Sequence, residues 1–267
     1  MKLAITGKGG TGKTTIAGVL ARYFSKDGYE VLAVDADPVA NLASAIGMPE
    51  DEASAIVPVS RHRQLIKERT GAKPGEVGQM FKINPTVNDI PDKYCVHFHG
   101  IKLLVMGGIQ KGGSGCACPE NTLLRGLLSE IILNRNEVVI VDMEAGIEHL
   151  GRATSRSIDR MIIVVEPGWR SIEAAKTIMR LAGEIGVKSF GVIGNKIQNE
   201  EQENKIKEQF PPDIILGMVS YRDLIQDADL NRRSLADTLD DALQQEFNEI
   251  YRAVKSGLPA GPETPTR

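Results

Sequence analysis

One stretch near the start of the chain decides the fold: Gly7-Lys8-Gly9-Gly10-Thr11-Gly12-Lys13-Thr14. It has the spacing G-x-x-x-x-G-K-[ST], in which glycines allow backbone N–H groups to close around phosphate oxygens. The apolar segment 2–6 precedes it, apolar residues recur at helical spacing over 16–24, and Gly28 stands where a glycine commonly ends a helix. The motif requires this order of strand, loop and helix, so the stretch predicts a phosphate-binding loop.

The two lysines of this loop predict two different phosphate contacts, one within the chain and one with a second nucleotide. Lys13 is placed to reach the β- and γ-phosphates of a nucleotide, and the Thr14 hydroxyl is placed to hold Mg²⁺. We include Thr15, the next residue, among those that bind the nucleotide. Because Lys13 already serves the loop, Lys8 is available for a second nucleotide. We therefore expect ATP or ADP with Mg²⁺, bound by a nucleotide-dependent homodimer.

Composition narrows the class of protein. The 267 residues include 42% hydrophobic and 25% charged residues, which is typical of a globular protein that can bury a real core. A net charge of −3 gives no broad attraction for nucleic acid or for an anionic membrane, and no apolar run has transmembrane length. Three cysteines do not make a disulfide framework. We expect a cytoplasmic protein that binds neither nucleic acid nor membrane.

Strand and helix patterns alternate along the chain. Apolar runs at 30–35, 101–106, 138–141, 161–165, 190–194 and 214–219 predict buried strands. Helices are expected at 61–69 and over the apolar stripe 123–132, with Asn121 as the cap of the second. This alternation predicts an α/β fold, a doubly wound and mostly parallel sheet with helices on both faces. We expect one P-loop ATPase domain over 1–255 and a disordered Pro/Gly-rich tail over 256–267.

Carboxylates follow two of these strands. Asp142 ends an apolar run, where a carboxylate that holds Mg²⁺ is expected, and the segment 142–146 has the D-x-x-x-G pattern of a switch that senses the γ-phosphate. Asp35 and Asp37 end the second strand, and either one is a candidate for orienting the attacking water. Aspartate before Pro38 is also common in ordinary turns, so the spacing alone leaves the catalytic role open.

A cysteine pair, Cys116 and Cys118, follows a glycine-rich segment. Two thiolates cannot complete a tetrahedral site, but a symmetric dimer with this loop at its axis supplies four. Such a site suits Zn²⁺, another borderline or soft transition ion, or an iron–sulfur cluster. A pair of reduced cysteines without a ligand is the alternative.

A second group of possible ligands is Cys95, His97 and His99, which alternate in the sequence. On a strand their side chains share one face, so a metal site there is conceivable. A half-buried strand with ordinary histidines explains the same pattern more simply.

With these residues in view, the chain resembles the deviant-Walker-A ATPases, whose signature has the form of Lys8–Thr14. That family includes cell-division positioning and plasmid-partition ATPases and the nitrogenase iron protein. Within it, the chain is most similar to the accessory ATPases that mature nickel carbon monoxide dehydrogenase. The segments that carry this similarity are 111–118, with its cysteine pair, and 142–150, and it extends over nearly the whole chain up to the tail.

The resemblance implies a role for several residues. Lys8 is implied to reach the partner's phosphates across a nucleotide-closed dimer, and Asp37 to activate water, which favours it over Asp35. Asn195 is implied to read adenine, and Cys116 and Cys118 to form an intersubunit site for Ni²⁺, with Zn²⁺ able to take its place.

One departure concerns the base pocket. Ser220 stands before Tyr221 where the family has proline, so adenine contacts beyond Asn195 stay unassigned.

The resemblance also implies a function, the insertion of nickel into carbon monoxide dehydrogenase or its relative acetyl-CoA synthase. Two alternatives stay open. A positioning or partition ATPase needs a basic amphipathic tail or surface, and the segment after Tyr251 has too few apolar residues for one. An iron–sulfur reductase component takes its cysteines from separate positions, whereas this chain has a Cys-x-Cys pair.

Overall fold

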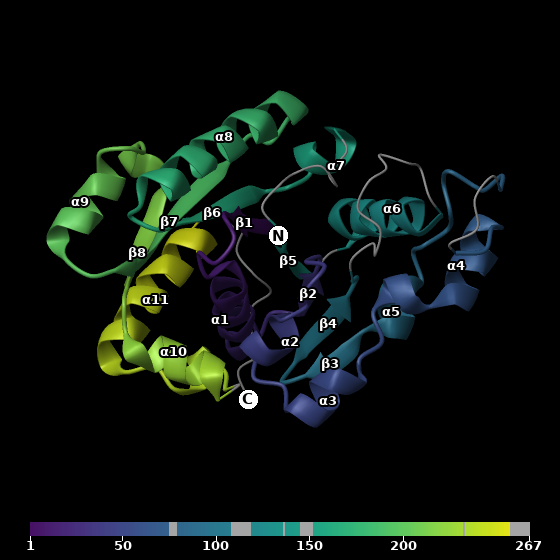
Figure 1. Ribbon diagram of the computed structural model, residues 1–267, viewed down its shortest axis with the longest axis horizontal. Helices are drawn as coiled ribbons and strands as arrows, with labels where there is room; N and C mark the ends of the chain where they lie inside the picture. The colour runs from purple at the N-terminus through teal and green to yellow at the C-terminus, as the bar shows by residue number, and fades with distance from the viewer. Residues whose placement is uncertain (75–78, 108–118, 136, 145–151, 232, 257–267) are drawn as a thin grey trace.

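The computed structural model describes residues 1–74, 79–107, 119–135, 137–144, 152–231 and 233–256 (Figure 1). Its strands are β1 Lys2–Gly7, β2 Val31–Asp35, β3 Val96–Phe98, β4 Ile101–Val105, β5 Val138–Asp142, β6 Arg160–Val165, β7 Phe190–Ile197 and β8 Ile215–Ser220. The α-helices are α1 Lys13–Lys26, α2 Leu42–Ala45, α3 Glu50–Ala55, α4 Arg63–Thr70, α5 Ile90–Tyr94, α6 Pro119–Asn134, α7 Arg152–Arg156, α8 Trp169–Ile185, α9 Glu200–Lys207, α10 Asp223–Leu230 and α11 Asp241–Lys255. Three 3₁₀ turns are η1 Val59–Arg61, η2 Pro212–Ile214 and η3 Leu235–Asp237.

The described strands form one sheet in the order β3-β4-β2-β5-β1-β6-β7-β8. Every neighbouring pair is parallel except β3 with β4. β1 lies between β5 and β6, so the phosphate loop that follows it is at the centre of the carboxyl edge. The predicted fold class is confirmed.

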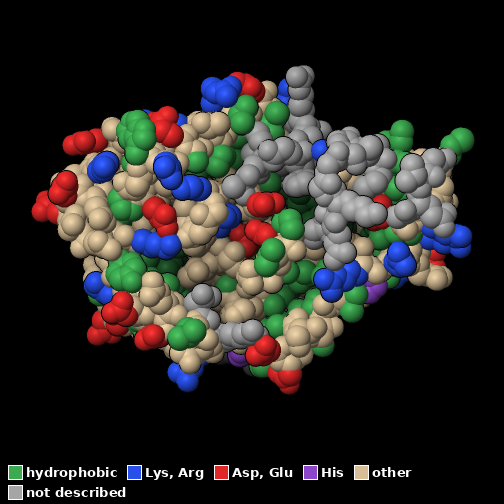
Figure 2. Space-filling view, viewed as in Figure 1, with side chains coloured by type: hydrophobic (Ala, Val, Ile, Leu, Met, Phe, Trp, Pro, Cys, Tyr) green, Lys and Arg blue, Asp and Glu red, His purple; other side chains and the backbone are tan. Residues whose placement is uncertain are grey.

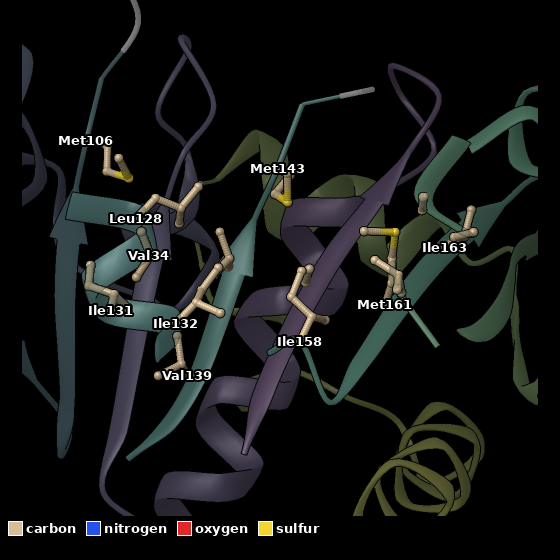
Figure 3. Packing of buried hydrophobic residues seen from close by; sticks show 14 of the residues in the cluster. Val34, Met106, Leu128, Ile131, Ile132, Val139, Met143, Ile158, Met161 and Ile163 are labelled. Carbon is tan, nitrogen blue, oxygen red and sulfur yellow. The ribbon is translucent and has the colours of Figure 1, made fainter. Parts of the chain in front are cut away.

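Helices cover both faces of this sheet, because successive side chains of a strand point to opposite faces. Leu3 and Ile5 of β1 pack in a cluster with α1, α2 and α11, whereas Ala4 between them packs in the cluster of α4, α6 and α8. Figure 1 shows α6 and α8 on one side of the sheet and α1, α10 and α11 on the other. Figure 3 shows Leu128 of α6 lying over Val34 of β2 in the first of these layers.

The ends of two helices test the expectations from sequence. Gly28 has φ +84° just after α1, so the predicted glycine at its end is confirmed. The predicted cap at Asn121 is wrong, because α6 begins two residues earlier, at Pro119. Proline has its φ already set for the first turn of a helix and has no N–H to satisfy there, which explains the earlier start.

The extent of the domain stays a prediction, and residues 257–267 of the expected tail lie outside the described part of the chain. No helix in the described ranges is long and apolar enough to cross a membrane. On the face in Figure 2, acidic and basic side chains are interspersed over α8, α9 and α11, without an extended basic patch in the described part.

Candidate nucleotide site

The phosphate loop joins β1 to α1 and turns tightly on itself. The Thr11 hydroxyl donates to the Lys8 carbonyl at 2.9 Å, and the Thr11 N–H donates to the same carbonyl at 3.3 Å. Helix α1 begins directly after the loop, at Lys13, so its first free N–H groups and the positive end of its dipole face the loop. This is the arrangement that binds a phosphate group.

Two of the loop's positions require glycine. Gly12 has φ +91°, and a Cβ there would lie 2.3 Å from the Asn195 side-chain nitrogen. A Cβ at Gly7 would lie 2.5 Å from the Val164 carbonyl oxygen on the neighbouring strand β6. Any side chain at these positions would push the loop away from β6 and β7, so the two glycines set the position of the phosphate loop as well as its shape.

The two lysines of the loop lie in different environments. The Lys13 side chain is buried, and its ammonium lies 3.4 Å from the Lys8 carbonyl oxygen, so it is held over the loop. Lys8 itself is exposed. An exposed lysine at this position is free to reach a group outside its own chain, which is consistent with the role implied for Lys8.

Asp35 and Asp142 meet at the carboxyl ends of β2 and β5, where they are directly opposite each other in the parallel register. Asp35 is fully buried, and its carboxylate accepts the N–H groups of Asp37 at 3.2 Å, Asn41 at 3.0 Å and Leu42 at 2.9 Å. Burial raises its pKa to about 6, against the opposing effect of these three donors. Asp35 therefore holds the loop between β2 and α2.

Asp142 is equally buried but differently partnered. Neither of its carboxylate oxygens has a hydrogen-bond partner of normal geometry among the described residues, although the Thr14 hydroxyl and the Lys13 ammonium lie near enough to favour its charged form. Burial, together with the negative charges of Asp35 and Asp37, raises its pKa to about 7. A buried carboxylate without donors beside a threonine hydroxyl is a donor set suited to Mg²⁺, so the residues present fit the predicted ion.

Asp37 lies in the loop that Asp35 holds. It is partly exposed, and among the described residues its carboxylate accepts only the Val39 N–H, at 2.8 Å. It is close enough to Asp35 and Asp142 to raise the pKa of each. Of the two candidates for orienting water, Asp35 is fully buried and already accepts three backbone N–H groups, whereas Asp37 is partly exposed and accepts one among the described residues. The geometry therefore favours Asp37, whose catalytic role stays a prediction.

Asn195 lies at the carboxyl end of β7, against the phosphate loop. Its side-chain NH₂ donates to the Thr11 carbonyl at 2.7 Å, and it is buried. The adenine contact implied for it stays a prediction. Its neighbour Lys196 donates to the Gly10 carbonyl at 2.7 Å and pairs with Glu166 at 2.5 Å. Reasoning from the sequence assigned no role to Lys196 or Glu166, because neither belongs to a spaced motif.

Both predicted cysteine ligands, Cys116 and Cys118, lie outside the described residues, as do residues 145–150 of the predicted switch. Cys95 lies half buried just before β3, and burial raises the pKa of its thiol to about 12. Of its two neighbours in the pattern, only His97 lies within β3, and His99 follows it with φ +46°. No three His, Cys, Asp or Glu side chains in the described ranges gather as metal ligands.

Residues 2–235 match the family model of the CobQ/CobB/MinD/ParA nucleotide-binding domain, so the chain belongs to this family. It is a P-loop ATPase.

Among particular relatives, the chain is 48% identical over 229 residues to the carbon monoxide dehydrogenase accessory protein CooC of Rhodospirillum rubrum, covering 86% of this chain and 87% of that protein. It is 47% identical over 257 residues to an uncharacterized ATP-binding protein of Methanocaldococcus jannaschii, covering 95% of this chain and 97% of the relative. The MinC–MinD cell division complex of Aquifex aeolicus includes a chain of the same fold, with a TM-score of 0.67, 20% identity, and coverage of 99% and 98% of the two chains.

Proposed function

We propose that the chain is a cytoplasmic maturation factor that uses ATP to insert nickel into a nickel–iron–sulfur enzyme, either carbon monoxide dehydrogenase or acetyl-CoA synthase. The observation that carries this proposal is the 48% identity to a carbon monoxide dehydrogenase accessory protein over 86% of the chain. The pair Cys116 and Cys118 adds the thiolates that a borderline metal ion prefers.

In this proposal ATP binds on the loop 7–14, with Lys13 on its phosphates. Thr14 and Asp142 hold Mg²⁺, which neutralises charge on the β- and γ-phosphates when it is bound. Asp37 orients the attacking water, and Lys8 reaches the nucleotide of a second subunit. The buried, unpaired carboxylate of Asp142 supports its role as a ligand of Mg²⁺. The exposed side chain of Lys8 supports its reach to the second subunit.

Nickel is the cargo, and two copies of the Cys116–Cys118 pair supply four thiolates at the dimer interface. ATP binding draws the subunits together and hydrolysis relaxes them, which changes the metal site. The coupling is reciprocal, so a nucleotide that changes nickel affinity is itself bound differently when nickel is present. A coupling of about 1–3 kcal/mol changes affinity roughly 5- to 150-fold, enough for uptake and release.

The test is anaerobic nickel binding at equilibrium, with and without ADP or a non-hydrolysable ATP analogue, read against the mass of the oligomer. We expect one Ni²⁺ per dimer, lost in Cys116→Ala/Cys118→Ala while ADP binding is kept. Cys95→Ser is the matched control, because the Cys95 thiol is half buried with a pKa of about 12, and it should bind nickel as the wild type does. Affinity should fall as pH falls and the thiols protonate.

Three other results would contradict the proposed metal site or support a different function. Nickel retained by the double variant would overturn the proposed metal site. No metal, with dimers still formed on ATP and binding to liposomes or DNA in a pull-down, would support a positioning ATPase instead. A brown anaerobic sample with charge-transfer absorption would support an iron–sulfur component.

A further inference from the structure

The carboxyl end of β7 holds the phosphate loop by two adjacent carbonyl groups. Lys196 donates to the carbonyl of Gly10 and Asn195 to that of Thr11, each at 2.7 Å. The N–H and C=O of a trans peptide point in opposite directions. Holding the Thr11 carbonyl outward therefore directs the N–H of the same peptide, that of Gly12, toward the inside of the loop, where phosphate oxygens bind. Holding the Gly10 carbonyl instead supports the turn that the Thr11 N–H closes by donating to the Lys8 carbonyl at 3.3 Å.

The backbone of β7 is distorted where these two side chains arise. The register between β7 and β8 shifts between Gly194 and Ile197, and Lys196 has φ +61°. A non-glycine residue in the left-handed region is strained, and a bulge aims a side chain that a regular strand would point elsewhere. The Lys196 N–H donates to the Asn195 side-chain oxygen at 2.9 Å, which directs the NH₂ of that amide toward the loop.

The positive charge of Lys196 is neutralised by a carboxylate of the same chain. Its ammonium lies 2.5 Å from a carboxylate oxygen of Glu166, at the end of β6. The Glu166 N–H in turn donates to the hydroxyl of the buried Ser171, which fixes the start of the β6–α8 connection. Lys196 is thus bound by one carboxylate and one carbonyl, whereas neither Lys8 nor Lys13 lies within ion-pair distance of a carboxylate among the described residues.

We propose that Lys196, paired with Glu166, is a positioning residue for nucleotide binding that keeps the phosphate loop in its nucleotide-binding shape. It acts through the Gly10 carbonyl, and its positive charge is neutralised by Glu166, so it is no phosphate ligand. This role depends on the P-loop ATPase activity and not on nickel delivery, so failure of the nickel proposal leaves it unaffected.

The experiment measures ADP affinity by calorimetry, and kcat and KM for ATP, in Lys196→Met. This variant keeps the aliphatic stem and loses the donor. We expect ADP affinity to fall and KM for ATP to rise about 3- to 10-fold, as loss of one hydrogen bond to the loop predicts, with kcat changed less than about 2-fold. Lys196→Arg should recover most of the affinity. The thermal midpoint without nucleotide should change little, because the Lys196–Glu166 pair is partly exposed.

The matched control is Lys207→Met, which removes a lysine of similar exposure from its ion pair with Glu203 on α9. It should leave both ADP affinity and KM unchanged.

A second variant, Glu166→Gln, separates the proposed role from direct phosphate binding. If Lys196 positions the loop, loss of its charged partner weakens ADP binding. If Lys196 is a phosphate ligand that Glu166 restrains, the same change frees its charge and tightens ADP binding. Tighter binding in Glu166→Gln, or unchanged ADP affinity in Lys196→Met, would overturn the proposal. The Glu166→Gln arm also stands by itself if Lys196→Met fails to fold.

Discussion

Replacing Asp142 by asparagine should stabilise the protein free of metal and nucleotide while removing its response to Mg²⁺. The side chain of Asp142 is 1% exposed, and neither oxygen has a hydrogen-bond partner of normal geometry among the described residues. Burying a charge without donors is unfavourable, so the native protein carries this cost in order to keep a metal ligand in place. Asparagine has a similar shape and no charge.

The magnitude follows from the pKa of the carboxyl. A rise from 3.8 to about 7 at about 1.4 kcal/mol per pH unit makes the buried charged form cost about 4 kcal/mol at pH 8. Asparagine brings two new N–H donors into a buried place where the carboxylate had no hydrogen-bond partner of normal geometry, which returns roughly 1–3 kcal/mol of that gain. We therefore expect Asp142→Asn to add about 2 kcal/mol to the free energy of unfolding at pH 8, or roughly 5 °C in Tm.

The pH dependence has a definite sign. Between pH 4 and 7 the folded wild type binds a proton at Asp142 that the unfolded chain does not, so its stability rises as pH falls from 8 to 5. Asp35, with its pKa raised to about 6, contributes in the same direction. The advantage of Asp142→Asn is therefore largest at pH 8 and falls to roughly zero near pH 5, where the cost of the charge only matches the cost of the new amide. Near pH 4 the carboxyl is neutral in the folded wild type, and the variant should be the less stable protein.

The assay is thermal unfolding in EDTA without nucleotide, from pH 5 to 8, repeated with Mg²⁺ and ADP. Mg²⁺ with ADP should stabilise the wild type much more than the variant, which should also lose Mg²⁺-dependent ATPase activity. Asp213→Asn, which changes an exposed carboxylate in η2, is the control and should match the wild type throughout. An Asp142→Asn protein less stable than the wild type at pH 8, or a difference independent of pH, would refute the reasoning.

Three further outcomes are expected. Gly12→Ala should weaken ADP binding more than 10-fold by calorimetry, because its Cβ would lie 2.3 Å from the Asn195 side-chain nitrogen at φ +91°; near-normal affinity would contradict the observed loop geometry. Tyr251→Phe removes the 2.7 Å hydrogen bond from α11 to Asp27 and should cost about 1 kcal/mol in urea unfolding; no loss would mean that this bond contributes nothing. Cys95, with its thiol pKa raised to about 12, should resist iodoacetamide at pH 8 until the protein is unfolded, as peptide mass mapping can check; rapid alkylation would show that it is not buried as described.

Much of the fold could be predicted from local pattern. Buried parallel strands have apolar runs of four to eight residues, and the runs ending at Asp35 and Asp142 were recognised for this reason. The antiparallel edge strand β3 and the start of α6 were harder to predict from the sequence. A three-residue strand carries little periodicity, and the first residue of a helix depends on its cap. Where the sequence placed Asn121 as that cap, the proline at position 119 had already begun the helix.

By itself the sequence determined the phosphate loop, the alternation of buried parallel strands with helices and, through them, the class of ATPase, because spacing and periodicity are properties of neighbouring residues. Only the tertiary structure decided how the polar groups at the site are partnered. Asp35 and Asp142 each end an apolar strand, yet Asp35 accepts three backbone N–H groups and Asp142 accepts none from the described residues. The contact of Lys196 with the loop joins residues 186 positions apart. Partners so distant in the chain meet only when the sheet has formed, so no local pattern records them.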